Sequence, residues 1–345
     1  MRISTQAGYA LAAVATVALA TAPVIASANT IHPFIQSHVQ RPSLSRQLPP
    51  SILIPGVARQ LRTVTGPVGY HYTSIPNAKN DYVYSCHYYG SDCRIFNLSG
   101  QQTGQLTATA DGLSNPQGTD VGKKGHWYIA NTGASNVPEY NAGGAKLLQT
   151  LSDSGQYPVD VATHPHGVVV SNIYTTSFTA GSVDVFNGNS TTASYSLTDP
   201  NAFQGIGVTY DKAGNCYWSY NDNSGIGQID EFPKCASGAS PVNLGLSLGF
   251  AGGIAFDGSD NLWYSDQLSG LYKCNGTSNC TQVLTGFSDG LMINFNKSWK
   301  TLYVADAGAG NIDSVNPNNP AIVVFASPGT SDPPFGVTAS PSSKF

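Results

Sequence analysis

Charged and helix-forming residues are scarce in this sequence. Asp, Glu, Lys and Arg together make up 10% of the 345 residues, and only two acids, Glu139 and Glu231, are glutamates. Runs of Leu, Glu and Lys, which favour helices, are nearly absent. Gly, Ser, Thr and Asn are plentiful instead. This composition is typical of a protein built from many short strands joined by tight turns.

Several signatures of function are also missing. The sequence has no G-x-S-x-G nucleophile elbow, no G-x-G-x-x-G between a strand and a helix, and no C-x-x-C pair. Residues 66–345 hold all twenty acids and eleven of the basic residues, which gives this region a formal net charge of −9. A nucleic-acid partner is therefore not expected, because it requires a basic stripe.

The first 65 residues differ from the rest. Residues 1–28 combine Arg2, an apolar run from Tyr9 to Ala20 and the small residues Ala26-Ser27-Ala28, which together predict a cleaved secretory signal. An uncleaved membrane anchor is the alternative, although the apolar run is short for a spanning helix. Residues 29–65 are rich in Pro and Ser and have four Arg and no acid, which predicts a disordered basic linker. We therefore expect a secreted or periplasmic protein with no stable membrane span after signal removal.

A repeat of about 44 residues runs through most of the chain. Its clearest copy, GGIAFDGSDNLWYSDQLSGLYKC from Gly252 to Cys274, reads as three strands separated by two turns. The second strand recurs six times, ending at Cys86, Asn131, Asn172, Tyr220, Asp266 and Asp306. A Gly- or Pro-led apolar strand precedes every copy except the first. Repeats of this length indicate the blades of a β-propeller.

The missing first strand is found at the other end of the chain. The segment PFGVTAS, from Pro334, matches GIGVTY at Gly205. We expect Gly336 and Val337 to pair beside the segment Tyr82–Tyr84, so that the C-terminal strand joins the N-terminal blade. Closing the ring in this way removes an open sheet edge. The prediction is an all-β fold over residues 66–345: a six-bladed β-propeller of four-stranded antiparallel blades.

The six cysteines fall into three neighbouring pairs. Six thiols permit fifteen pairings, so the sequence alone proves none of them. Each neighbouring pair lies within one predicted blade, which favours Cys86–Cys93, Cys216–Cys235 and Cys274–Cys280. Free buried thiols are the alternative, and a signal peptide makes them the less favoured one.

Asp and Asn residues follow the second strands or lie in the links before the first strands, and strand direction places both positions on one face of the propeller. The predicted ligand face contains Asn115, Asn131, Asn172, Asn221, Asp222, Asp266, Asp289, Asp306 and Asp332. Oxygen atoms that converge near the axis would suit a divalent cation such as calcium, or the hydroxyls of a sugar. The alternative is that each side chain only caps its own turn. His164 and His166 are expected in a turn on the opposite face.

The repeat resembles known propeller families. Its pattern P-x-G-(V/I)-x-x-D-x-x-G-x-(L/V)-(Y/W)-(V/Y)-(A/S)-(D/N) is similar to NHL repeats, and also to the senescence-marker-protein/gluconolactonase, strictosidine-synthase-like and virginiamycin-B-lyase-like propellers. The lactonases hold a divalent metal with one Glu, two Asn and one Asp. The resemblance assigns the Asp to Asp289, in SDGLMINF, and one Asn loosely to Asn115. The Glu-Gly-Pro signature of the lactonases is absent, and the two Glu lie in third strands, away from the position the lyases use.

Two functions follow as hypotheses. The first is an exported binding module that presents its Asp/Asn-lined face to a small ligand, a glycan or a protein partner. The second is a metal-dependent lactonase-type hydrolase or lyase in which Asp289 contributes to the metal site. The resemblance indicates the fold and leaves the choice open, because propellers support many functions.

Overall fold

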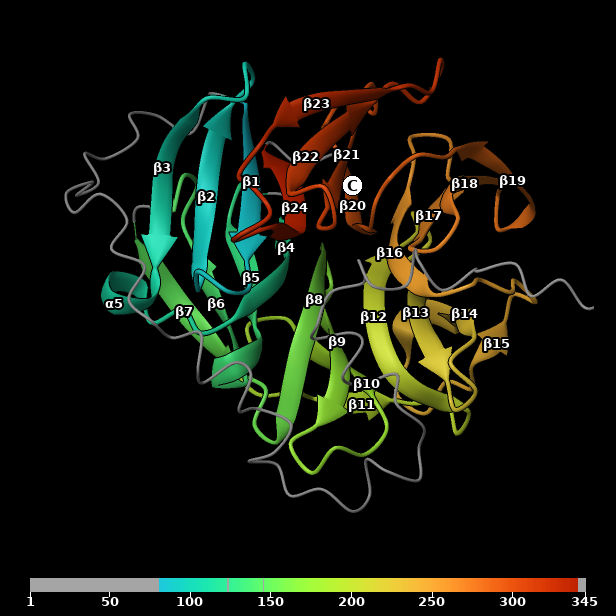
Figure 1. Cartoon of the computed structure of the whole chain (residues 1–345). Helices are drawn as coiled ribbons and strands as arrows, with labels where there is room; N and C mark the ends of the chain where they lie inside the picture. Colours follow the sequence, from blue (N-terminus) through green and yellow to red (C-terminus); the bar gives the residue numbers. More distant parts are fainter. Residues whose placement is uncertain (1–80, 123, 145, 341–345) are drawn as a thin grey trace, which may run out of the picture.

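The computed structural model describes residues 81–122, 124–144 and 146–340. The predicted signal, the linker and the first residues of the predicted propeller domain lie outside this part. Within it, the chain forms six four-stranded sheets arranged as blades around one axis (Figure 1). The predicted six-bladed β-propeller is confirmed. No helix among the described residues is long and apolar enough to cross a membrane.

Each blade is an antiparallel sheet whose first strand lies next to the axis and whose last strand lies at the outside. Blade 1 contains β24 (Pro334–Ser340), β1 (Tyr82–His87), β2 (Asp92–Asn97) and β3 (Gln102–Thr107). Blade 2 contains β4 (Pro116–Val121), β5 (Trp127–Asn131), β6 (Asn136–Tyr140) and β7 (Leu147–Ser152). Blade 3 contains β8 (Gln156–His164), β9 (Gly167–Thr175), β10 (Ser182–Asn187) and β11 (Tyr195–Leu197).

The other three blades follow the same order. Blade 4 contains β12 (Ala202–Tyr210), β13 (Cys216–Asp222), β14 (Gly227–Phe232) and β15 (Val242–Asn243). Blade 5 contains β16 (Ala251–Phe256), β17 (Leu262–Asp266), β18 (Gly270–Asn275) and β19 (Ser278–Leu284). Blade 6 contains β20 (Gly290–Phe295), β21 (Leu302–Asp306), β22 (Asn311–Val315) and β23 (Ile322–Ala326). The helical segments are short: α5 (Ala108–Asp111), η3 (Thr132–Ala134) and η4 (Pro233–Cys235).

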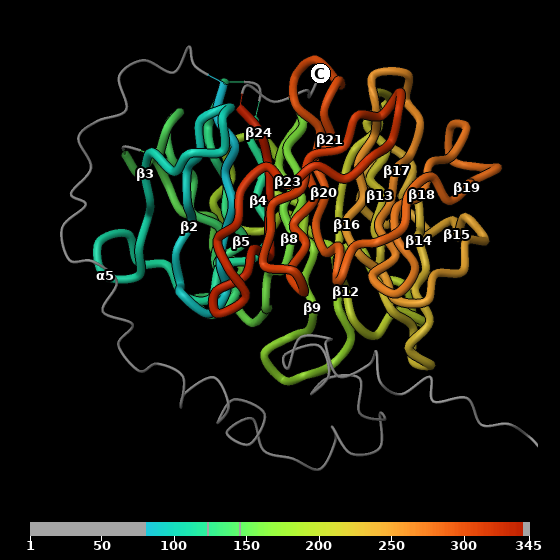
Figure 2. The backbone as a smooth tube through the Cα atoms, turned by 45° about the horizontal axis from the view of Figure 1, so that its top comes forward, coloured from blue at the N-terminus to red at the C-terminus, as the bar shows by residue number. Residues whose placement is uncertain are grey.

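Blade 1 closes the ring. Its inner strand β24 pairs antiparallel with β1, as the sequence predicts, although chain positions 82 and 340 are far apart. The register differs from the expected one: Gly336 lies opposite Cys86 and Val337 opposite Ser85. Figure 2 shows the C-terminal strand beside the N-terminal blade.

Alternating strand directions give the propeller two distinct faces. The link face carries the connections between blades and the turns between second and third strands. The turn face carries the turns between first and second strands. Six inner strands, β24, β4, β8, β12, β16 and β20, contact one another in a ring around the axis.

Glycine allows the inner strands to approach closely. An added Cβ on Gly253 of β16 would lie 2.6 Å from the backbone nitrogen of Ile293 and 2.7 Å from the Cα of Met292, both in β20. An added Cβ on Gly336 of β24 would lie 2.1 Å from the carbonyl oxygen of Gln117 in β4. Real Cβ atoms do not approach backbone this closely. A side chain at these positions would therefore push neighbouring blades apart.

Each interface between neighbouring blades has its own apolar core. Blades 1 and 2 share a cluster around Trp127, blades 3 and 4 share one around Trp218, and blades 5 and 6 share one around Trp263. All three Trp side chains are fully buried. Three further clusters join blades 2 and 3, 4 and 5, and 6 and 1. Burial between blades therefore supplies the main hydrophobic stabilisation of the fold.

Three disulfides lie within single blades, with the predicted pairing. Cys86–Cys93 joins β1 to β2, Cys216–Cys235 joins β13 to η4, and Cys274–Cys280 joins β18 to β19. Each closes a short loop of chain, for which the entropic model gives a stabilisation of about 2–3 kcal/mol.

The close packing at the axis predicts a difference between two glycine substitutions. Gly253→Ala should lower the free energy of unfolding by roughly 1–3 kcal/mol, because the new methyl group meets backbone that cannot move aside. Gly122→Ala is the control, since its Cβ would have an ordinary contact of 3.4 Å with the Tyr128 ring. Urea denaturation of both variants measures the difference. Equal stability of the two would contradict the packing argument.

Candidate functional site

The predicted Asp and Asn residues reach the link face, where several of them bind backbone amides. Asp266 accepts hydrogen bonds from the amides of Gly249, at 2.8 Å, and Phe250, at 3.1 Å. Asp306 accepts from Ser288 and Asp289, at 2.9 and 2.8 Å. These carboxylates fix the link that leads into their own blade, because hydrogen bonds to a charged acceptor are among the stronger ones.

In blades 2 and 4, amide side chains accept hydrogen bonds from link residues. The Oδ1 atom of Asn131 accepts from the amide of Ser114 at 2.6 Å. The Oδ1 atom of Asn221 accepts from the amide of Ala251, in the next blade, at 2.9 Å. The (A/S)-(D/N) ending of the second-strand repeat therefore has a structural function in blades 2, 5 and 6, and in blade 4 the residue after the repeat, Asn221, has a similar one.

Three more of the predicted residues also form hydrogen bonds with nearby turns and strands. Asp222 caps its turn by accepting from the amides of Ser224 and Ile226, at 2.7 and 3.0 Å. Asn115 has a positive φ of 50° and donates through Nδ2 to the carbonyl of Tyr88 at 3.0 Å. Asn172 donates through Nδ2 to Ser182 Oγ at 3.2 Å. The structure thus places these side chains on one face and directs their hydrogen bonds into turns and strands.

Asp289 differs from them because neither of its carboxylate oxygens has a hydrogen-bond partner. The residue is 2% exposed. Burial, with a smaller contribution from the negative charge of Asp306, raises the pKa of Asp289 to about 7. A carboxyl group in this position is protonated at mildly acidic pH and is costly to ionise.

One group of potential metal ligands in the described residues has suitable spacing, and it does not include Asp289. It comprises His87, Asp92 and Asp332. Arg94 already occupies this group, since it donates to Asp92 Oδ1 at 3.1 Å and forms an ion pair with Asp332. His87 Nδ1 donates to the carbonyl of Asp332 at 2.8 Å. Burial, followed by the charge of Arg94, lowers the pKa of His87 to about 3, so its ring is neutral. The guanidinium makes this a structural ion cluster that joins blade 1 to the last link.

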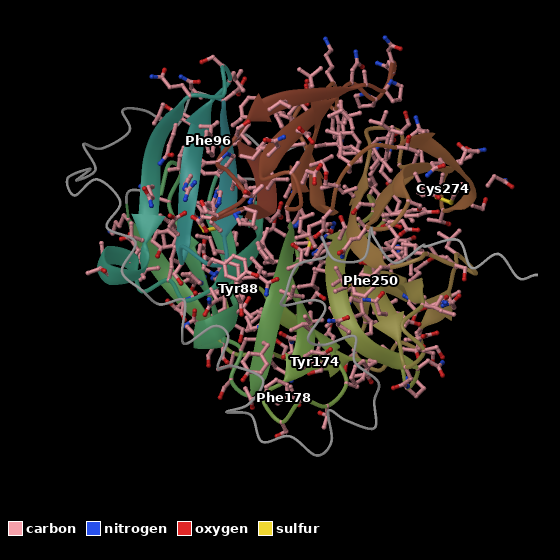
Figure 3. All side chains as sticks on the ribbon, in the orientation of Figure 1. Tyr88, Phe96, Tyr174, Phe178, Phe250 and Cys274 are labelled. Atoms are coloured by element: carbon pink, nitrogen blue, oxygen red, sulfur yellow. A yellow bond between two sulfur atoms is a disulfide. The ribbon has the colours of Figure 1, made fainter. Side chains whose placement is uncertain are left out.

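Apolar side chains pack around the axis on the link face. The cluster includes Tyr88 and Phe335 of blade 1, Tyr174 of blade 3, Phe250 before blade 5 and Met292 of blade 6. Figure 3 shows Tyr88, Tyr174, Phe178 and Phe250 around the same region. Sequence reasoning missed this cluster, although aromatic residues at the start of several inner strands were a visible signal.

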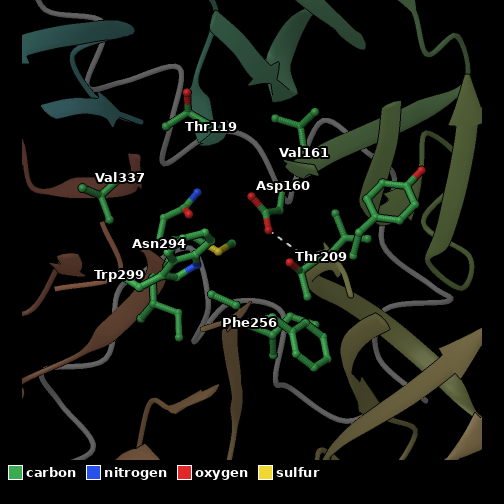
Figure 4. Close-up of a pocket in the computed structure, with 14 residues that line it drawn as sticks. Thr119, Asp160, Val161, Thr209, Phe256, Asn294, Trp299 and Val337 are labelled. Atoms are coloured by element: carbon green, nitrogen blue, oxygen red, sulfur yellow. Dashed lines mark hydrogen bonds between the residues drawn. The ribbon is translucent and has the colours of Figure 1, made fainter. Parts of the chain in front are cut away.

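A hollow of about 480 Å³, open mouth included, lies on the axis toward the turn face. Its wall is formed by inner strands of all six blades together with one turn. The lining residues are Thr119, Asp160, Val161, Val208, Thr209, Tyr210, Ile254, Ala255, Phe256, Met292, Ile293, Asn294, Trp299 and Val337. Figure 4 shows Asp160, Thr209 and Asn294 pointing toward a common centre.

The polar groups of the hollow are held in place by neighbouring blades. Asp160 Oδ2 accepts from the amide of Val208, across the interface between blades 3 and 4, at 2.9 Å. Asn294 Nδ2 donates to Asp120 Oδ1 at 3.2 Å and to Thr338 Oγ1 at 3.1 Å. A carboxylate and an amide thus face the axis with fixed orientation, as in a preformed ligand site.

Aromatic residues form the rim of the hollow. Tyr210 stacks on His164, with ring centroids 4.8 Å apart and an interplanar angle of 28°. Trp299, in the turn between β20 and β21, has a positive φ of 53° and packs over Gly258, whose added Cβ would be 3.0 Å from the indole. The turn-face position predicted for His164 is confirmed, because it ends β8. The hollow itself was not predicted.

The raised pKa of Asp289 predicts how stability depends on pH. The folded-state pKa of about 7 exceeds the ordinary value of 3.8, so the folded protein binds more protons between these values. Stability should therefore fall as pH rises from about 4 to 7 and stay low above that. Asp289→Asn removes this term and should be more stable than the wild type at pH 8, by up to roughly 3–4 kcal/mol, with no advantage below pH 4.

Urea denaturation at pH 4, 6 and 8, with EDTA present, measures this dependence. Asp222→Asn is the control, because an amide oxygen can keep the turn-capping hydrogen bonds. An Asp289→Asn variant less stable than the wild type at pH 8 would contradict the prediction and indicate an ionised, paired carboxylate.

Comparison with known proteins identifies the fold. No family model and no curated protein matches the chain. A chain from a structure titled "Crystal structure of Nidogen/Laminin Complex" aligns with a TM-score of 0.62 and 15% identity, covering 77% of this chain and 100% of that one. A "Streptogramin B lyase structure" aligns with a TM-score of 0.47 and 12% identity, covering 72% of this chain and 74% of that one. At these identities the first similarity shows the fold alone: this chain is a disulfide-containing six-bladed β-propeller.

Proposed function

We propose that the protein is an exported binding module and that its ligand enters the axial hollow from the turn face. Three disulfides support an oxidising environment such as the extracellular space or periplasm. The net charge of −9 over residues 66–345 supports a partner other than nucleic acid.

The observation that carries the proposal is the combination of polar and aromatic groups in the hollow. Asp160, Thr209 and Asn294 can accept or donate hydrogen bonds, while Phe256 and Trp299 offer apolar ring surface. A sugar presents hydroxyl groups together with an apolar face of C–H groups, so it matches both parts. A monosaccharide, or the end of a glycan chain, is therefore the proposed ligand class. The enclosed part of the hollow is small, about 20 Å³, so the sugar would lie mainly in its open mouth.

This proposal moves the ligand from the predicted Asp/Asn-lined link face to the opposite face. The link-face oxygens of Asp266 and Asp306 already accept several backbone hydrogen bonds each. Exchanging those bonds for a ligand would release the links between blades.

A metal-dependent lactonase or lyase is a second candidate, and Asp289 is the observation that favours it. Its two oxygens have no hydrogen-bond partner, and its pKa is raised to about 7 by burial. Lactone hydrolysis that requires a divalent cation and is lost in Asp289→Asn would support this function. Hydrolysis that is absent, or unchanged in the variant, would contradict it.

Two substitutions in the hollow test the binding proposal. Trp299→Ala removes the largest ring at the rim, and Thr209→Val replaces a hydroxyl with a methyl group of similar size. Each should weaken binding by roughly 5- to 150-fold, since a lost buried contact of this kind is worth about 1–3 kcal/mol. Titration of a panel of neutral monosaccharides and their methyl glycosides, followed by calorimetry, gives the dissociation constants.

The control is Leu268→Ala, which removes a 58% exposed side chain from a link-face turn and should leave binding unchanged. Sugar binding that survives both hollow substitutions would place the ligand elsewhere. A wild-type protein that binds no sugar of the panel would contradict the proposed ligand class.

A further inference from the structure

Two neighbouring blades bury a pair of aspartates at equivalent positions. In blade 3, Asp184 of the third strand lies within hydrogen-bonding reach of Asp153, which precedes the first strand. In blade 4, Asp230 of the third strand is paired in the same way with Asp199. The side chains of both pairs are buried. Two adjacent carboxylates cannot both stay ionised in such a place without a compensating positive charge.

The blade 3 pair has few hydrogen-bond donors. Asp153 is 1% exposed, and neither of its oxygens has a hydrogen-bond partner. Asp184 is 4% exposed and receives one long hydrogen bond, from Ser182 Oγ at 3.4 Å. No ion pair joins either residue to a basic side chain among residues 81–122, 124–144 and 146–340.

A buried amide side chain lies beside the same carboxylates. Asn172 is completely buried, and its Nδ2 donates to Ser182 Oγ, the hydroxyl that contacts Asp184. The amide of Asn172 also lies close enough to Asp153 to lower its pKa, partly offsetting the increase caused by burial and by Asp184. Its Oδ1 atom is left without a hydrogen-bond partner, as is the buried Oε1 atom of Gln156, three residues after Asp153. Unpaired buried oxygens are rare in folded proteins, so those of Asp153 and Asn172 require an explanation.

The blade 4 pair, in contrast, receives several hydrogen bonds from the protein. Asn243 Nδ2 donates to Asp230 Oδ1 at 2.9 Å, and the amide of Asn201 donates to Asp199 Oδ1 at 2.5 Å. Tyr220 also offers its hydroxyl to Asp230 and thereby lowers the pKa of that carboxyl. These donors stabilise the negative charge of the blade 4 pair, whereas the blade 3 pair has only the hydroxyl of Ser182 and the amide of Asn172 beside it.

We propose that blade 3 binds a divalent cation, with Ca²⁺ the best match, between Asp153 and Asp184, with Asn172 and Gln156 as further oxygen ligands. Ca²⁺ takes six to eight oxygen ligands, including carboxylates and side-chain amide oxygens, in flexible geometry. Magnesium suits the set less well, because it requires stricter octahedral geometry and keeps several waters. The bound ion would join the link between blades 2 and 3 to the third strand of blade 3. This site is separate from the axial hollow and from Asp289.

Calcium titration of matched variants tests the proposal. The wild type and Asp230→Asn, the equivalent substitution in blade 4, are melted in EDTA and then at increasing free Ca²⁺ at pH 7.5. Both should gain roughly 2–4 °C in Tm for each tenfold rise in calcium above the dissociation constant. Asp153→Asn and Asp184→Asn should lose this response. Equilibrium dialysis with Ca²⁺ should show one more ion per chain for the wild type than for Asp153→Asn.

The competing occupant of the pair is a proton. If a proton is present instead, calcium will leave the wild-type Tm unchanged. Lowering the pH from 7.5 to 5 will then raise the Tm more in the wild type than in Asp153→Asn, which keeps the contribution of Asp289. That result would overturn the proposal, as would an equal calcium response in the wild type and Asp153→Asn. Should the variants fail to fold, dialysis of the wild type still decides, because absence of bound Ca²⁺ at millimolar concentration would also overturn it.

Discussion

The close approach of six inner strands around one axis is the constraint on which the rest of the structure depends. At positions such as Gly253 and Gly336 there is no room for a side chain, because the backbone of the next blade lies against the glycine. Hydroxyl groups reinforce the contact: Ser219 Oγ donates to the carbonyl of Gly252, and Ser265 Oγ donates to that of Leu291, at 2.6 and 2.7 Å. Both bonds cross from one blade to the next. The ring therefore leaves only a narrow space at its centre. The side chains that point into this space determine which part of it is filled.

This packing explains how the two ends of the axis come to differ. Toward the link face, aromatic side chains such as Tyr88 and Phe250 fill the centre with apolar surface. Toward the turn face, polar residues such as Asp160 and Asn294 replace them, and a hollow remains. Asp160 occupies a strand position that corresponds to Gly207 and Gly336 in other blades, so one substitution within a repeat converts a packing position into a polar one. The function proposed for the turn face follows from these departures from the repeat.

Much of the fold could be predicted because the sequence contains the same blade pattern several times. A 44-residue period, a C-terminal segment that matches an internal strand, and cysteines that fall within single repeats each point to the same ring, and the structure confirms all three. The predicted register of β24 against β1 was wrong, because strand patterns do not fix which residues of two paired strands lie opposite each other. The link-face location of Asp266 and Asp306 followed from strand direction alone.

The site could be predicted far less well. Whether Asp306 binds a ligand or the amides of Ser288 and Asp289 depends on the backbone path of a link, which no residue pattern encodes. The hollow combines Asp160, Asn294 and Trp299 from three parts of the chain. None of them belongs to the consensus of the repeat, so a search for the repeat passes over them. The same is true of Asp153, which lies in a link.

The seam of the ring has a mechanical consequence. Strand β1 begins, and strand β24 ends, on the turn face, where Tyr82 is paired with Ser340. Tension applied to these two strand ends would load the hydrogen bonds between them one after another, as in opening a zipper, instead of all together. The Cys86–Cys93 crosslink lies at the opposite end of the seam, beside Gly336, and leaves that opening direction unprotected. The closed ring would thus open under a small pulling force at one specific edge.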